Sequence, residues 1–103
     1  MCSAGNGSLD LDARGQGNNA GQAKAYPTLF NLPNLISVAA SDGVDNLVQF
    51  SNYGAKSVTI AAPGVEIYST SKNGGYRYFS GTSQASPIAA GAAALLKAYR
   101  PDF

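Results

Sequence analysis

The chain has 103 residues, a length that suits one small domain, and 45% of them are hydrophobic, which favours a globular core over disorder. Charged residues make up only 13%, well below the roughly 25% of ordinary soluble domains. The net charge is +1, without a block of like charges, which is not the pattern of a nucleic-acid or membrane-surface binder. We therefore expect neither nucleic acid nor a membrane among its partners.

Cysteine and histidine usage narrows the chemistry further. Cys2 is the only cysteine, so no internal disulfide can form, and there is no histidine, so no Cys/His cluster can hold zinc. No stretch approaches the roughly 20 apolar residues of a membrane span. The redox compartment stays undetermined at this level.

Residues 5–25 are rich in Gly, Asn and Asp and follow neither the helical nor the strand period, which predicts a long surface loop. Loops of such length are often functional. The carboxylates of Asp10 and Asp12 are potential calcium ligands. The alternative is a solvated loop without metal.

Two short apolar runs, residues 35–40 and 58–62, predict buried strands of a parallel sheet. Residues 66–70 and 76–79 predict two further strands. The Asn-Gly-Gly turn at residues 73–75 joins them, so the pair is expected to form a β-hairpin.

The last part of the chain predicts one helix over residues 83–99. Small residues cover its other faces, so most of its surface is expected to be buried in the complete protein, with Gly91 permitting a close approach. A parallel sheet needs crossover helices over its faces, and a single helix is too few, so we expect an incomplete sheet cut upstream of residue 1. The apolar positions that recur at spacings of three and four are Ile88, Ala92, Leu95, Leu96 and Tyr99.

The segment SGTSQASP, residues 80–87, places Ser83 on the first turn of this helix. A helix N-terminus offers unpaired backbone N–H groups and a partial positive charge. The N–H of Ser83 is therefore suited to stabilise an oxyanion formed where its own hydroxyl attacks, giving one residue two catalytic roles. The alternative is that Ser80, Thr82 and Ser83 only cap the helix, and the Gly-Thr-Ser tripeptide alone does not decide between the two.

The longer string SGTSQASPIAAGAAALL is similar to the serine signature of the subtilases, usually Gly-Thr-Ser-Met-Ala-Ser/Thr-Pro-His-Val-Ala-Gly. This resemblance implies a subtilisin-like three-layer α/β architecture with a mostly parallel sheet, here incomplete. Residues 1–103 would then be the C-terminal portion of a subtilisin-like peptidase domain whose N-terminal half is missing. Upstream segments that match family motifs in the same order are Ala4–Asn6, Tyr26–Pro27, residues 35–42, residues 50–54 and residues 62–65.

The resemblance implies a serine endopeptidase with a polypeptide substrate. Ser83 aligns with the nucleophile that forms the acyl-enzyme, and Asn6 with the residue whose side-chain amide stabilises the oxyanion. Ser3, Ala4 and Gly5 align with one wall of the primary specificity pocket, and their small size implies an open pocket. By the same resemblance no cofactor is required for chemistry, structural calcium is compatible with the full domain, and secretion is expected.

Asn6 has two alternative interpretations. The sequence Asn6-Gly7-Ser8 is an N-glycosylation acceptor pattern, and a glycan on this amide would remove the oxyanion donor and block the cleft. Asn6 is also a common type of turn residue. The Ala-Gly-Asn context favours the catalytic role.

The chain departs from the family pattern in several places. Gln84 replaces the usual Met, and Ile88-Ala89 replaces His-Val, which alters packing but no triad member. Because there is no histidine, no Ser-His pair can form within these residues, and none of the Asp residues is assigned as the triad acid; Asp42 and Asp45 are interpreted as turn residues. We therefore expect the chain alone to be inactive and to require Asp and His from the missing N-terminal part.

The lack of histidine also supports a competing hypothesis, a non-catalytic subtilase-like fragment or pseudoenzyme that acts as a binding module. An esterase of the nucleophile-elbow type is disfavoured because the sequence contains no Gly-x-Ser-x-Gly motif.

Overall fold

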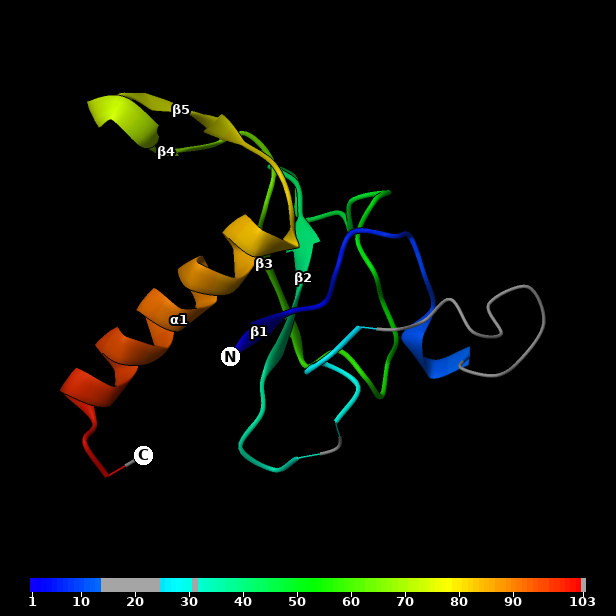
Figure 1. Ribbon diagram of the computed structural model, residues 1–103. Helices are drawn as coiled ribbons and strands as arrows, with labels where there is room; N and C mark the ends of the chain where they lie inside the picture. The colour runs from blue at the N-terminus through cyan, green and yellow to red at the C-terminus, as the bar shows by residue number, and fades with distance from the viewer. Residues whose placement is uncertain (14–24, 31, 103) are drawn as a thin grey trace.

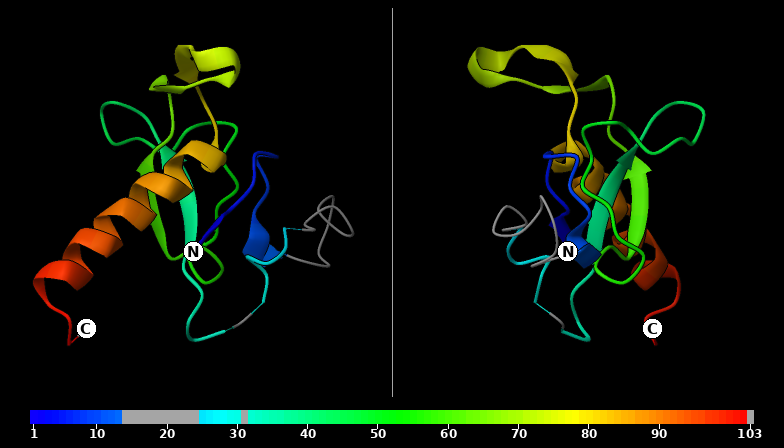
Figure 2. Two further views of the ribbon diagram at one scale, coloured as in Figure 1. Left: turned by 60° about the vertical axis from the view of Figure 1, so that its left-hand side comes forward. Right: turned by 90° about the vertical axis from the view of Figure 1, so that its right-hand side faces the viewer.

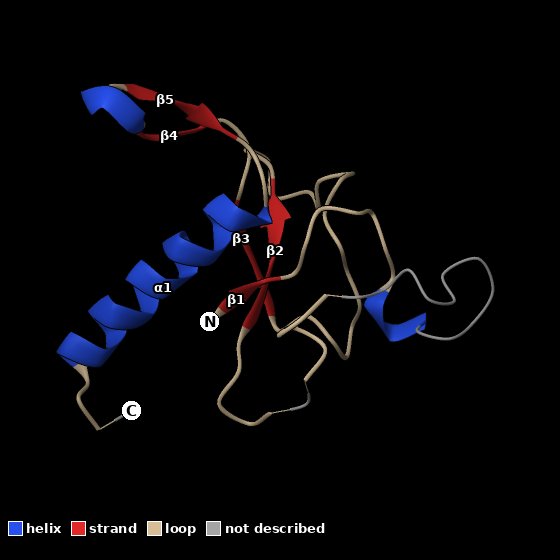
Figure 3. Cartoon of the chain, viewed as in Figure 1, coloured by secondary structure: helices blue, strands red, loops and turns tan. Residues whose placement is uncertain are grey.

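The computed structural model describes residues 1–13, 25–30 and 32–102. Five strands, two short 3-10 helices and one α-helix follow one another within these ranges (Figures 1 and 3). In chain order they are β1 Cys2–Ser3, η1 Leu11–Ala13, β2 Ser37–Ser41, β3 Ile60–Pro63, β4 Ile67–Thr70, η3 Lys72–Gly74, β5 Tyr76–Phe79 and α1 Thr82–Tyr99.

Three of the strands form the predicted parallel sheet, in the order β1-β2-β3. Cys2 is paired with Ser37, and Val38 is paired with Ile60, so β2 is the central strand of the three. The helix α1 packs over one face of this sheet and contacts all three strands (Figures 1 and 2). The α/β class expected from the sequence is confirmed, with one helical layer over the sheet in the described ranges.

The core between α1 and the sheet consists of small side chains. Val38 and Ala40 lie two residues apart on β2, so both side chains point to the same face, where they meet Ala85 and Ala89 of α1. Ala62 of β3 completes the cluster, with Val48 and Phe50 packed against it. Small residues let the helix lie close to the strands, which fixes where its first turn sits.

Gly64 brings the helix start onto the carboxyl end of β3. A Cβ atom at this position would lie 2.6 Å from the Cβ of Ala40 and 2.7 Å from the carbonyl oxygen of Gly81. The N–H of Gly81 donates a 2.7 Å hydrogen bond to the Gly64 carbonyl. Only glycine allows this approach, so Gly64 positions the turn that precedes α1.

The predicted helix is confirmed, but its large apolar residues do not face the described core. Its buried side chains are Thr82, Ala85 and Ala89. Leu95 and Tyr99 are 75% and 84% exposed, and a Cβ at Gly91 would meet nothing within 4 Å. The expectation that the surface of the helix is covered in the complete protein therefore stays a prediction.

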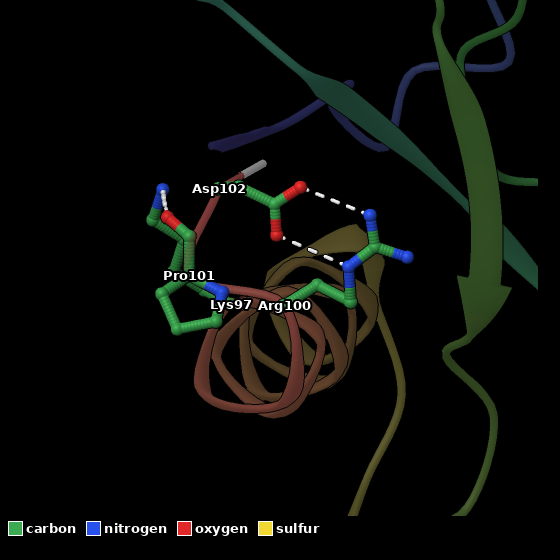
Figure 4. Close-up of polar contacts among 4 residues, drawn as sticks. All are labelled: Lys97, Arg100, Pro101 and Asp102. Atoms are coloured by element: carbon green, nitrogen blue, oxygen red, sulfur yellow. Dashed lines mark hydrogen bonds and ion pairs between the residues drawn. The ribbon is translucent and has the colours of Figure 1, made fainter.

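Polar contacts among nearby residues are made at the C-terminal end of α1 (Figure 4). The Arg100 N–H donates to the Leu96 carbonyl, and the Lys97 ammonium donates to the Pro101 carbonyl at 2.7 Å. The Arg100 guanidinium binds both carboxylate oxygens of Asp102, at 3.1 and 2.9 Å. This pair is exposed to solvent, which screens it, so it contributes little to the stability of the fold.

The predicted hairpin is confirmed by the antiparallel pair β4 and β5, with Ile67 opposite Phe79 at its base. The ring of Tyr68 stacks on Tyr76 and lies against Tyr78, with centroids 5.7 and 5.0 Å apart. Asn73 in the connecting turn has φ 65°, a conformation that asparagine tolerates better than most residues. The hairpin projects beyond the sheet, above the start of α1 (Figure 1).

Asp42 and Asp45 are turn residues, as predicted. One carboxylate oxygen of Asp42 accepts hydrogen bonds from the N–H groups of Val44 and Asn46, at 3.0 and 2.9 Å. Asp45 has a positive φ of 64° in the same turn. Both residues therefore shape the connection after β2.

The prediction of a surface loop over residues 5–25 holds for most of its first part but misses a buried residue, Leu11, in the short 3-10 helix η1. Leu11 is fully buried and packs with Leu29, and Leu9 and Val58 lie against this second apolar cluster. Burying these leucines anchors the segment, which the polar composition around them did not suggest. Residues 14–24 lie outside the described ranges.

Asp12 joins η1 to the loop before β3 through hydrogen bonds. Its carboxylate accepts backbone N–H bonds from Lys56 and Ser57, both at 2.8 Å. Hydrogen bonding by Ser57, and next by the Lys56 backbone, holds the pKa of the Asp12 carboxyl below its usual value of 3.8. The ionised form is therefore favoured in the folded state.

A pH-dependent contribution to stability follows from this pKa. A carboxyl whose pKa is lower in the folded state stabilises the fold above its unfolded pKa, and the stabilisation is lost as the pH falls through the folded value. The melting temperature of the full-length protein should therefore exceed that of Asp12→Asn by a constant amount above about pH 5. The difference should shrink below pH 3.8. Asp45→Asn, in an exposed turn, is the matched control, and a difference for Asp12→Asn that is independent of pH would contradict this role.

Candidate active site

Asn6 and the start of α1 are joined directly, although 76 positions separate them in the sequence. The side-chain oxygen Oδ1 of Asn6 accepts a 2.9 Å hydrogen bond from the Thr82 N–H and a 2.8 Å bond from the Thr82 hydroxyl. The other polar atom of this side chain is the amide nitrogen Nδ2. Among the described residues Nδ2 has no hydrogen-bond partner, so it is a free donor on an exposed side chain.

Thr82 binds both Asn6 and the residue before it. It is fully buried, and its hydroxyl accepts a 3.1 Å bond from the Gly5 N–H while donating to Asn6. The segment after β1 and the start of α1 are thereby joined through one side chain. From the sequence Thr82 was considered only as a helix-capping residue, although its place inside the Gly-Thr-Ser motif was the available signal for a role at the site.

Ser83 is exposed at the second position of α1. Thr82 donates to Asn6, and Gln84 and Ala85 donate to the Gly81 carbonyl. In the described part of the chain, the backbone N–H of Ser83 has no acceptor. The nucleophile candidate therefore carries a free N–H at the positive end of the helix.

The two free donors converge beside Gly81. A Cβ atom built on this glycine would lie 3.6 Å from Nδ2 of Asn6 and 3.7 Å from the backbone nitrogen of Ser83. The space next to the Gly81 Cα is thus within reach of both nitrogens. The side-chain oxygen of Gln84 also borders this space, 2.9 Å from the same Cβ position. A substrate oxygen can therefore accept from both nitrogens once the flexible Gln84 side chain moves aside.

Two hollows lie on either side of this point. The first brings together the predicted pocket residues Ser3, Ala4 and Gly5 with Asn6, and Ala25 and Tyr26 lie at its other side. The second was not predicted from the sequence and lies between the hairpin and α1. It is lined by Ile67, Tyr68, Ser69, Thr70, Phe79, Ser83, Gln84, Pro87 and Ile88. Asn6 thus faces one hollow and Ser83 the other.

Among the described residues, no side chain is hydrogen-bonded to the Ser83 hydroxyl as a general base would be. The sequence contains no histidine, and in the described ranges no hydrogen bond joins the Ser83 hydroxyl to another side chain. The Ser83 hydroxyl on its own therefore has the reactivity of an ordinary alcohol.

The described residues do not form a calcium site at Asp10 and Asp12. Both carboxylate oxygens of Asp12 accept backbone N–H groups, and one oxygen of Asp10 accepts the Asp12 N–H. No group of three or more His, Cys, Asp or Glu residues in these ranges is arranged to hold a metal ion. Calcium binding elsewhere in a full domain stays a prediction.

The described ranges contain no helix that is both long enough and apolar enough to cross a bilayer.

Comparison with known sequences identifies the family of this chain. The family model described as the subtilase family matches residues 1–103. A thermophilic serine proteinase from Bacillus sp. (strain AK1) is 49% identical over 80 residues, which are 78% of this chain and 19% of that protein. Subtilisin-like protease 2 from Plasmodium falciparum (isolate 3D7) is 43% identical over 93 residues, 89% of this chain and 7% of that protein. The chain thus spans less than a fifth of the length of either relative.

Solved structures agree with the sequence comparison. The crystal structure of a cold adapted subtilisin-like serine proteinase superposes with a TM-score of 0.75 at 33% identity, over 95% of this chain and 31% of that one. The structure of the prenylagaramide maturation protease PagA gives a TM-score of 0.75 at 32% identity, over 97% of this chain and 32% of that one. The α/β arrangement of sheet and helix is therefore shared with subtilisin-like proteases.

Proposed function

This chain belongs to the subtilase family of serine proteases, and from that premise we propose that the protein is an endopeptidase that forms an acyl-enzyme on Ser83. The Ser83 hydroxyl attacks the carbonyl carbon of a peptide bond, and its proton passes to a base. The carbonyl oxygen becomes an oxyanion, and collapse of the intermediate expels the amine, which takes up that proton. Water then releases the acyl group by the same steps.

The observation that carries this proposal is the convergence of two free donors beside the serine. Nδ2 of Asn6 and the N–H of Ser83 both lie close to the space next to Gly81. Preorganised donors around the position of a developing oxyanion stabilise the transition state without further reorganisation. If Ser83 only capped the helix, there would be no need for a second donor beside it. Asn6, whose side chain is bound by Thr82, supplies such a donor next to Gly81.

A histidine base must come from outside these 103 residues, since the sequence has no histidine. We propose that an upstream part of the same protein supplies the Asp and His of the triad. That part is also the partner that completes the sheet and covers the exposed face of α1. No cofactor takes part in this chemistry.

Peptide-bond hydrolysis is tested with the full-length gene product. We expect it to cut an unfolded protein such as reduced casein, and mass spectrometry should show new N-termini inside the substrate chain. An irreversible serine-directed inhibitor should stop the reaction, and a metal chelator should leave the catalytic step unchanged. Correctly folded full-length protein that leaves the substrate intact would contradict the proposal.

Gly81→Ala tests the space between the two donors. The added methyl group would lie 3.6 and 3.7 Å from Nδ2 of Asn6 and the Ser83 nitrogen, where the oxyanion must fit, and 2.9 Å from the side-chain oxygen of Gln84, which has to move. Gly81 also has φ +157°, so alanine strains the backbone there. We expect kcat to fall about 10²-fold, the effect of displacing reacting groups by about 1 Å. Gly74→Ala is the matched control, since Gly74 also has a positive φ, +76°, and a Cβ there meets nothing within 4 Å. Equal activity of the two variants would show that the oxyanion does not occupy this space.

The absence of histidine favours a second candidate, a pseudoenzyme that uses this fold as a binding module. The two candidates differ in one measurable property. In the pseudoenzyme the full-length protein would fold and bind polypeptides while neither hydrolysing them nor reacting with serine-directed probes.

A further inference from the structure

Asn52 is a buried amide beside the candidate site that the proposed chemistry does not use. It lies in the loop between β2 and β3 and is 4% exposed. All three of its side-chain hydrogen bonds go to the loop that carries Asn6. Nδ2 donates to the Ala4 carbonyl at 2.9 Å, and Oδ1 accepts from the N–H groups of Gly7 and Leu9, both at 3.0 Å.

These bonds are placed on both sides of Asn6 in the sequence. Ala4 precedes Asn6 by two residues, and Gly7 and Leu9 follow it. A fourth bond runs from the backbone N–H of Asn52 to the Gly5 carbonyl, at 2.9 Å. Asn52 is therefore bonded to the backbone of this loop before and after the catalytic candidate.

The fit between the two segments is close. A Cβ atom at Gly5 would lie 2.5 Å from Nδ2 of Asn52, and Gly5 has φ +101°, a conformation that favours glycine. The amide thus packs directly against the backbone just before Asn6. Any smaller or differently shaped side chain at position 52 would leave the N–H groups of Gly7 and Leu9 without their acceptor.

We propose that Asn52 is a positioning residue that aligns Nδ2 of Asn6 with the oxyanion. Thr82 binds the side chain of Asn6 on one side, and Asn52 fixes the backbone from which that side chain extends. Because Nδ2 of Asn6 has to point to within a fraction of an ångström of its target, losing the backbone anchor weakens it as a donor. This role rests on the proposed function of Asn6.

A double-mutant cycle in the full-length protein separates positioning from a purely structural role. If Asn52 acts through Asn6, Asn52→Ser lowers kcat about 10-fold or more with little change in KM. In an Asn6→Ala background the same substitution lowers kcat less than about twofold, because the donor it would misplace is already gone. Asn52→Asp, which keeps the acceptor for Gly7 and Leu9, should fall between Asn52→Ser and the parent protein.

Ser51→Ala is the matched control. Ser51 is the neighbouring buried residue, and its hydroxyl binds the Ala40 N–H and the Asn52 carbonyl, away from the loop that carries Asn6. Its effect should be the same in both backgrounds. Equal kcat losses for Asn52→Ser in both backgrounds, or no loss in either, would overturn the positioning role.

The cycle also distinguishes this proposal from the proposed function itself. If Asn6→Ala alone leaves kcat unchanged, Asn6 is not the oxyanion donor, and the proposed chemistry fails first. If Asn6→Ala lowers kcat and Asn52→Ser does not, only the positioning role fails. Should Asn52→Ser not fold, as judged by its melting curve, the same comparison is made with the isosteric Asn52→Asp, and additivity with Asn6→Ala overturns the proposal.

Discussion

Ser83→Ala is expected to lower kcat of the full-length protein by about 10⁶-fold, the loss known for the nucleophile of a subtilisin and carried over from that enzyme. The physical reason is that the acyl-enzyme route needs an oxygen nucleophile at this position. The oxyanion donors survive the substitution, because alanine keeps its backbone N–H and Asn6 is untouched. A residual rate above the uncatalysed one, by roughly 10³-fold, should therefore persist. Initial rates with a fluorogenic peptide measure both quantities.

The matched control for this experiment is Ser86→Ala. Ser86 lies three residues further along the same helix and belongs to the same sequence motif, but it lines neither hollow beside the site. Its alanine variant should keep kcat within about twofold of the parent, since substitutions away from special features change little. Equal losses for both variants would point to damage to the helix rather than to a missing nucleophile.

Asn6→Asp is expected to lower kcat by at least about 10²–10³-fold, the loss caused by removing the corresponding donor from a subtilisin. Aspartate keeps an oxygen to accept the two Thr82 bonds, so the loop and helix start should stay joined. The donor Nδ2 is replaced by a negatively charged oxygen, which repels an oxyanion. KM should change much less than kcat, because the lost interaction is made mainly in the transition state.

Asn34→Asp makes the same change of charge at an exposed loop position and should leave kcat unchanged. A fall in KM or in melting temperature without a fall in kcat would contradict the donor role and favour a simple turn residue. Mass spectrometry of the Asn6 peptide from the full-length protein, isolated from its own host, tests the remaining alternative. The catalytic role predicts an unmodified amide, and a glycan on Asn6 would exclude it.

The parts of the fold that sequence reasoning predicted are those with a local signal. The hairpin followed from β-forming residues on both sides of an Asn-Gly-Gly turn, and its second strand, Tyr76–Phe79, has the predicted bounds. The helix begins one residue earlier than predicted, at Thr82. The central strand is shifted by two residues at its start, to Ser37, because an apolar run does not show where pairing with a neighbour begins.

The parts that were not predicted depend on contacts between distant segments. Leu11 is buried because Leu29 and Val58 approach it from elsewhere in the chain, and nothing in a Gly-rich and Asn-rich stretch signals that approach. The large apolar residues of α1 gave the right helix but not its buried face, since the described sheet packs on Ala85 and Ala89.

The candidate site shows the same division. Ser83 and Asn6 were singled out because each lies in a recognisable motif, and their catalytic roles stay predictions. The residues that bind Asn6 and its loop were not predicted for this role: Thr82 and Asn52 make hydrogen bonds across 76 and up to 48 positions of sequence. Spacing along the chain carries no information about such bonds.

The most direct test of the central claim is covalent labelling of the full-length protein with a fluorophosphonate probe, followed by peptide mapping. The probe reacts with serines that a base has activated and leaves ordinary alcohols unmodified. The proposed function predicts one labelled peptide, with the phosphonate on Ser83, and no labelling of Ser83→Ala. Folded full-length protein that stays unlabelled, or that is labelled at another residue while Ser83 stays free, would contradict the assignment of Ser83 as the nucleophile.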